Sequence, residues 1–141
     1  MDNRLVATVA VALAAAAAAG CSTPPSALGG TTAKVTIDGE NAAEAQAVVC
    51  SQTGWMWNIK TPGEPTKLTA FLNSEGGDVT VQSVDFRDLG GFTGTFWDGR
   101  VGKAEVTGQG GKFTITGEAD GSFKDNPSNA VTATFRIEAN C

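Results

Sequence analysis

Three cysteines are the residues whose positions point most directly to chemistry. Cys21 follows a short apolar segment, Val6–Ala19, which one cation, Arg4, precedes. A membrane-spanning helix needs roughly 20 apolar residues, so this shorter segment is typical of a secretory signal peptide. Residues 18–21, Ala-Ala-Gly-Cys, fit a lipobox, where bacteria attach lipid to the cysteine thiol and cleave the chain before it. The alternatives are an uncleaved anchor helix, or an ordinary signal followed by an incidental cysteine.

The lipobox predicts the location of the protein. We expect a lipoprotein signal peptide over residues 1–20 and a lipidated Cys21 at the start of the mature chain. Each buried methylene of an acyl chain contributes about 0.8 kcal/mol, so a diacylglyceryl group plus an amide-linked chain anchors a protein stably. The protein is therefore expected to be exported and held by lipid on the outer face of the cell membrane, within the cell envelope.

The other two cysteines, Cys50 and Cys141, are candidates for a disulfide. Export places them in an oxidising compartment, where disulfides persist. A bond between them would close a loop of roughly 90 residues, for which the chain-entropy model gives about 4–5 kcal/mol of stabilisation. The alternative is two free thiols, one of them reactive.

Composition limits the catalytic chemistry. The chain has no histidine and no tyrosine, and its formal net charge is −5. The commonest general base and metal ligand is therefore absent, and an acidic domain is repelled by nucleic acid. Carboxylates leave glycosidase-type chemistry formally open, with Asp85, Asp88 and Asp98 as candidates by residue type. Their spacing does not mark a paired acid and base, so we expect no enzyme activity, no metal and no cofactor.

A polar tether is expected over residues 21–33, followed by one domain over residues 34–141. The tether is rich in Ser, Thr, Pro and Gly and cannot bury a core. Hydroxyls in it are candidates for O-linked sugar, chiefly Thr23, Thr31 and Thr32. The alternative is a bare linker.

The domain has the pattern of an all-β fold. Short alternating segments recur with turn signals every eight to twelve residues or so, which predicts an antiparallel β-sandwich or barrel-like sheet of about 7–9 short strands. Turns are expected at Asp38–Gly39 and Gly108–Gly111, and the last strand over Val131–Cys141. Residues 41–47, rich in Ala and Glu, are the one helical possibility.

Aromatic residues are the candidates for a ligand groove. Alternation along a strand places Trp55, Trp57 and Ile59 on one face, and the adjacent Phe96 and Trp97 on opposite faces. A groove for acyl chains or sugar would be lined by Trp55, Trp57, Phe92 and Trp97. The alternative is that these rings fill the core or pack at its edge.

The C-terminal half resembles a known family. The segments at residues 110–121 and 135–141, Gly-Gly-Lys-Phe-Thr-Ile-Thr-Gly-Glu-Ala-Asp-Gly and Phe-Arg-Ile-Glu-Ala-Asn-Cys, are similar to the mycobacterial nineteen-kilodalton lipoprotein antigen family, the LpqH type. Asn126–Pro127, Val35–Gly39 and Val48–Cys50 match that family at similar spacing. The resemblance covers most of residues 34–141 and the lipobox. Between Trp55 and Trp97 the chain departs from the family by carrying more aromatic residues.

The resemblance carries functional expectations. It implies a lipid-anchored envelope antigen, often glycosylated in its linker, whose acylated N-terminus is recognised by Toll-like receptor 2. It pairs Cys50 with Cys141 and brings no catalytic residues. The leading hypothesis is thus a non-enzymatic surface antigen and interaction module, with a host innate immune receptor as a candidate partner. The alternative is a protein that binds or carries an envelope lipid or glycolipid.

The anchor is tested by Cys21→Ser, which removes the thiol that accepts lipid. We expect this variant to be released into the medium or to accumulate as an unprocessed precursor, because no acyl chain then holds it. Immunoblotting of membrane and medium fractions measures the outcome. Membrane retention of a processed variant at the level of the unaltered chain would contradict the lipobox assignment.

Overall fold

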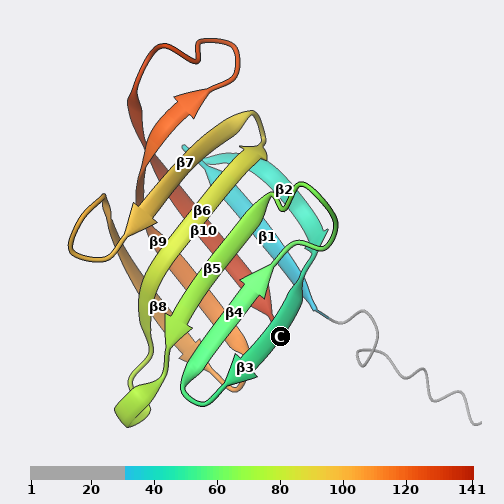
Figure 1. Cartoon of the computed structure of the whole chain (residues 1–141). Helices are drawn as coiled ribbons and strands as arrows, with labels where there is room; N and C mark the ends of the chain where they lie inside the picture. Colours follow the sequence, from blue (N-terminus) through green and yellow to red (C-terminus); the bar gives the residue numbers. More distant parts are fainter. Residues whose placement is uncertain (1–30) are drawn as a thin grey trace, which may run out of the picture.

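The structure, a computed structural model, describes residues 31–141 as an antiparallel sheet of ten strands curled into a barrel-like form (Figure 1). No helix in this part of the chain is long and apolar enough to cross a membrane. The all-β, barrel-like prediction is confirmed, with more strands than predicted. The strands are β1 Thr32–Ile37, β2 Glu40–Ala47, β3 Val49–Thr53, β4 Met56–Lys60, β5 Leu68–Asn73, β6 Thr80–Leu89, β7 Phe92–Trp97, β8 Lys103–Gln109, β9 Lys112–Phe123 and β10 Val131–Asn140, with a short 3-10 turn η1 at Glu75–Gly77.

The two outer strands of the sheet are consecutive in the chain. The strand order is β2-β1-β10-β9-β7-β6-β5-β4-β3, with β8 added beside β9. Val48 is the single residue between β2 and β3, and its side chain is 3% exposed. Its N–H donates to the carbonyl of Thr31 at 3.1 Å, and its own carbonyl accepts from the Thr31 hydroxyl at 2.6 Å. One continuous segment therefore pairs first with β1 and then with β4, which brings the two edges of the sheet together.

The helical possibility at residues 41–47 is wrong. These residues form most of β2, paired antiparallel with β1. Their Ala and Glu content favours a helix only weakly, and the backbone hydrogen bonds to β1 outweigh that preference.

Tight hairpins set the register of the strands. Asp38 and Gly39 both have positive φ, 50° and 78°, as a two-residue turn between right-handed strands requires. The Asp38 carboxylate also accepts a hydrogen bond from the backbone N–H of Thr134 at 2.9 Å, which ties this turn to β10. Gly90–Gly91 and Gly110–Gly111 join β6 to β7 and β8 to β9 in the same way. The turn predicted at 38–39 is present, and the one predicted at 108–111 is shorter, because Gly108 and Gln109 pair with β9 and leave Gly110–Gly111 as the turn.

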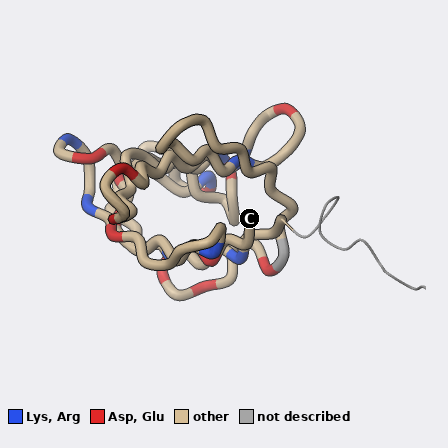
Figure 2. Tube along the Cα trace, turned by 90° about the horizontal axis from the view of Figure 1, so that it is seen from below, with Lys and Arg blue, Asp and Glu red and all other residues tan. Residues whose placement is uncertain are grey.

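Apolar side chains fill the interior of the barrel. Along β10 the residues alternate regularly between buried and exposed, with Ala133, Phe135, Ile137 and Ala139 inside. Figure 2 looks along the barrel, and its open centre in the backbone trace is occupied by the buried core. Two sets of ring contacts stiffen this core. Phe86 contacts both Phe92 and Phe135, Phe92 contacts Phe123, and Trp57 meets Phe113 edge to face at 5.2 Å between centroids.

A disulfide links two strands that are not neighbours in the sheet. Cys50 of β3 is bonded to Cys141, which follows β10, with 5.7 Å between their Cα atoms. The N–H of Cys141 donates to the carbonyl of Gly111 at 2.6 Å, so the chain end also contacts the β8–β9 hairpin. The pairing agrees with the expectation from the sequence.

Removal of the disulfide is expected to destabilise the fold. In Cys50→Ala/Cys141→Ala the unfolded chain regains the freedom of a loop with a sequence separation of 91 residues. We expect the free energy of unfolding to fall by roughly 2–5 kcal/mol while the β circular dichroism spectrum is kept. Urea titration with and without reductant measures this. A change below about 1 kcal/mol would mean that the barrel does not depend on the crosslink.

Candidate functional site

The predicted lipidation and glycosylation sites fall on both sides of the described boundary. Cys21 and Thr23 lie outside the described residues, and their roles stay predictions. Thr31 and Thr32 belong to the barrel: the Thr31 hydroxyl donates to the Val48 carbonyl, and Thr32 lies in β1 between β2 and β10. The first strand thus begins two residues before residue 34, the predicted start of the domain.

The four aromatic residues predicted to line a groove lie in different environments. Phe92 is fully buried, because it is an inward position of β7 and its ring packs on Phe86 and Phe123. Trp57 is partly buried against Phe113. Trp55 is 61% exposed, since it lies in the β3–β4 turn rather than in a strand beside Trp57 and Ile59. Trp97 is 56% exposed, while its neighbour Phe96 is buried, as alternation predicted.

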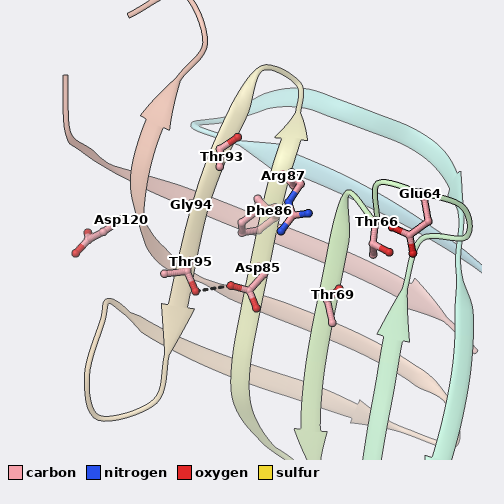
Figure 3. A pocket seen from close by; sticks show the side chains of 10 residues that line it. All are labelled: Glu64, Thr66, Thr69, Asp85, Phe86, Arg87, Thr93, Gly94, Thr95 and Asp120. Atoms are coloured by element: carbon pink, nitrogen blue, oxygen red, sulfur yellow. Dashed lines mark hydrogen bonds between the residues drawn. The ribbon is translucent and has the colours of Figure 1, made fainter. Parts of the chain in front are cut away.

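A polar groove lies instead on the outer face of the sheet (Figure 3). It has a volume of about 540 Å³ and crosses β5, β6, β7 and β9, with the β4–β5 loop at one side. Its polar lining consists of hydroxyls and carboxylates with one guanidinium, that of Arg87. These residues are Glu64, Thr66, Thr69, Asp85, Arg87, Thr93, Thr95 and Asp120.

The register of five strands produces a row of alternating hydroxyls and carboxylates, and all of its members except Thr132 line this groove. Thr69 pairs with Asp85, Asp85 with Thr95, Thr95 with Asp120, and Asp120 with Thr132. The Thr95 hydroxyl donates to the Asp85 carboxylate at 2.7 Å, and the Thr132 hydroxyl donates to that of Asp120 at 2.7 Å. We call these five residues the Thr–Asp row. Because directly opposed side chains are close together, the row forms a continuous strip of hydrogen-bonding groups.

Buried and backbone contacts hold the walls of the groove. The hydroxyl of Thr61, a side chain that is 2% exposed, accepts hydrogen bonds from the N–H groups of Lys67 and Leu68, which fixes the β4–β5 loop. The Thr93 hydroxyl accepts from the N–H of Asp88 at 3.0 Å. Between Thr93 and Thr95, Gly94 is an inward position of β7, where a Cβ would meet the buried Phe92 ring at 2.4 Å.

The groove carries hydrogen-bonding capacity rather than a catalytic pair. Asp85 and Asp120 are exposed and lie on one face of the sheet with Thr95 between them, instead of facing each other across a cleft. Of the other carboxylates that the sequence offered, Asp88 pairs with Lys124 at 3.8 Å, and Asp98 lies in the turn after β7. Within residues 31–141, no cluster of three or more potential ligands could hold a metal ion.

Sequence reasoning missed the Thr–Asp row. Each member is an ordinary polar residue on the outer face of its strand, and Asp85 is a candidate only by residue type. The row depends on the pairing of β7 with β9, which are separated in the chain by β8. A strand order would have been needed to find it.

The fold and the groove define a small antiparallel β-barrel-like domain whose polar groups are presented on its outer wall. Comparison with known proteins identifies the family of this domain. The sequence model of the Mycobacterium 19 kDa lipoprotein antigen family matches residues 26–141, and the chain belongs to this family. It is thus a member of a family of lipoprotein antigens, exported proteins associated with the membrane or envelope, and not of a known enzyme family. The resemblance recognised in the sequence is confirmed.

Individual relatives are also named as lipoproteins. A protein of Mycobacterium avium subsp. hominissuis named as a lipoprotein is 38% identical over all of this chain and 97% of its own length. The lipoprotein LppE of Mycobacterium tuberculosis is 31% identical over the whole of both chains. Lipoprotein LpqH of the same species is 34% identical over 77% of this chain and 68% of its own length.

The different positions of Phe92 and Trp97 give a direct test of the filled interior. Phe92→Ala removes a fully buried ring and should lower the free energy of unfolding by about 3–5 kcal/mol. Trp97→Ala removes an exposed ring and should cost less than about 1 kcal/mol. Chemical denaturation of both variants measures the difference. Equal losses would contradict the assignment of the two rings to opposite sides of the sheet.

Proposed function

We propose that this protein is a non-catalytic interaction module, held by acyl chains at Cys21 on the outer face of the cell membrane. The observation that carries the proposal is the filled interior: apolar side chains occupy the inside of the sheet, so the domain meets other molecules with its outer wall. Membership of a lipoprotein antigen family supports the anchor. The tether would span residues 21–30 and reach the barrel at Thr31, beside Val48.

The same observation disfavours the alternative, a carrier of acyl chains. A carrier must enclose an apolar ligand, and ligand cavities are lined predominantly by apolar side chains. Here the inward positions of the central strands are buried side chains in mutual contact, among them Phe92, Phe96, Ile59 and Leu72. The groove on the outer face is lined mainly by polar groups, so it suits a polar ligand better than an acyl chain.

Charge on the outer wall is mixed. Figure 2 shows acidic and basic residues interspersed around the wall and its loops rather than gathered by sign. The net charge of −5 disfavours long-range attraction to nucleic acid or to an anionic lipid surface. Attachment to the membrane would therefore come from the acyl chains, and contacts made by the barrel would be short-range.

The acylated N-terminus would be the part that acts as a Toll-like receptor 2 agonist. We expect the full chain isolated from membranes to activate Toll-like receptor 2 reporter cells, and Cys21→Ser to lose this activity, because the acyl chains are the apolar group available for burial in a receptor pocket. Cys50→Ala/Cys141→Ala, which alters the barrel and keeps Cys21, is the matched control and should remain active. A response to Cys21→Ser equal to that of the unaltered chain would contradict the proposal.

A further inference from the structure

We propose that the groove over β5, β6, β7 and β9 binds a neutral glycan, with the Thr–Asp row as its hydrogen-bonding floor. This inference rests on the proposed role as an interaction module and names the class of ligand that the module takes. It depends on the barrel alone and not on the acyl anchor.

The chemistry of the row matches a polyhydroxylated chain. An ionised carboxylate only accepts hydrogen bonds, and has about four lone-pair positions. Asp85 and Asp120 each hold one threonine hydroxyl, which leaves acceptor positions free for sugar hydroxyls. Arg87, in the same groove, supplies N–H donors for sugar oxygens. Strands lie about 4.8 Å apart, so the row presents a polar group at that interval across five strands.

Apolar surface for the C–H face of a sugar ring lies beside the groove, on the same outer face of the sheet. Trp97 lies two residues after Thr95 on the same face of β7, and it is 56% exposed. The guanidinium of Arg100 lies 5.1 Å from the centre of this ring and holds it in one orientation. In the adjacent row, Trp97 pairs with Ser83, which pairs with the partly buried Phe71.

Other occupants fit less well. A cation would need several carboxylates on one ion, but Asp85 and Asp120 lie two strands apart, roughly 9–10 Å by the strand spacing. A peptide that adds a strand needs a free sheet edge, whereas the groove crosses strands that are hydrogen-bonded on both sides. A basic peptide would be attracted by the carboxylates but would meet Arg87 within the groove.

The test is binding of maltohexaose, mannohexaose, cellohexaose and xylohexaose to the full chain, purified in a detergent without a sugar headgroup. We expect saturable binding of at least one of them by calorimetry, with Kd between about 10 μM and 1 mM. Asp85→Asn/Thr95→Val should weaken it at least roughly tenfold, since two hydrogen-bonding groups are changed at the centre of the row. Asp120→Asn is a second, independent variant and should weaken binding in the same direction.

The matched control is Glu105→Gln/Thr107→Val, which makes the same chemical changes on β8, outside the groove, and should leave Kd within roughly twofold. The thermal unfolding midpoint of each variant establishes that the barrel is folded. No saturable binding below about 10 mM would overturn the inference, as would equal binding by groove and control variants. Binding of hexalysine that the groove variants abolish, without binding of any oligosaccharide, would assign the groove to a basic peptide instead.

These outcomes are separable from those that test the anchor. Cys21→Ser protein, which carries no lipid, should bind the oligosaccharide with the affinity of the lipidated chain. If the groove variants lose glycan binding but keep normal membrane retention, the result tests the groove and not the anchor. If Cys21→Ser loses membrane retention but keeps normal glycan binding, the result tests the anchor and not the groove.

Discussion

The closure of the sheet at Val48 is the constraint on which the rest of the structure depends. A single segment, Glu40–Thr53, supplies both outer strands, because it turns from β1 to β4 at this buried residue. In the strand order each outer strand is paired on one side, β2 with β1 and β3 with β4, so the closure depends on the corner between them. Here the hydrogen bonds between Thr31 and Val48 and the disulfide from Cys50 to Cys141 hold the corner where the two edges meet. The curled sheet then has one inside and one outside.

This separation decides where the protein can act. The inside is filled by aliphatic side chains and by aromatic rings that contact one another. Burial of these apolar groups is therefore the main contribution to the stability of the fold. Polar residues are thereby placed on the outer wall, at positions fixed by strand register rather than by loops. The Thr–Asp row is the clearest result, because a rigid sheet holds its hydroxyls and carboxylates at regular intervals. The proposed lipid anchor is compatible with such a wall, since it would use Cys21 and leave the wall free.

The sequence predicts the local features of this fold well. Alternation along residues 131–139 identifies the buried face of β10, and Asp38–Gly39 identifies a hairpin, because both depend on neighbouring residues only. Long-range features are less accessible. The segment at residues 41–47 has a weak helical preference that pairing with β1 overrides, and Phe92 could be placed inside only once its contact with Phe86 was known. The Thr–Asp row needs the order of five strands, which no single segment encodes. The lipobox is the opposite case: its chemistry is local, and it lies outside the described residues.

The central claim is that the barrel is filled, so that the lipid this protein carries is covalent. The most direct measurement is the mass of the full chain extracted from membranes in mild detergent, recorded under native and then under denaturing conditions. The account predicts the same mass in both, equal to a chain that begins at Cys21, carries its acyl groups and lacks the two hydrogens of the disulfide. A native mass that includes an additional acyl lipid for each chain, lost on denaturation, would contradict it and would make the protein a carrier.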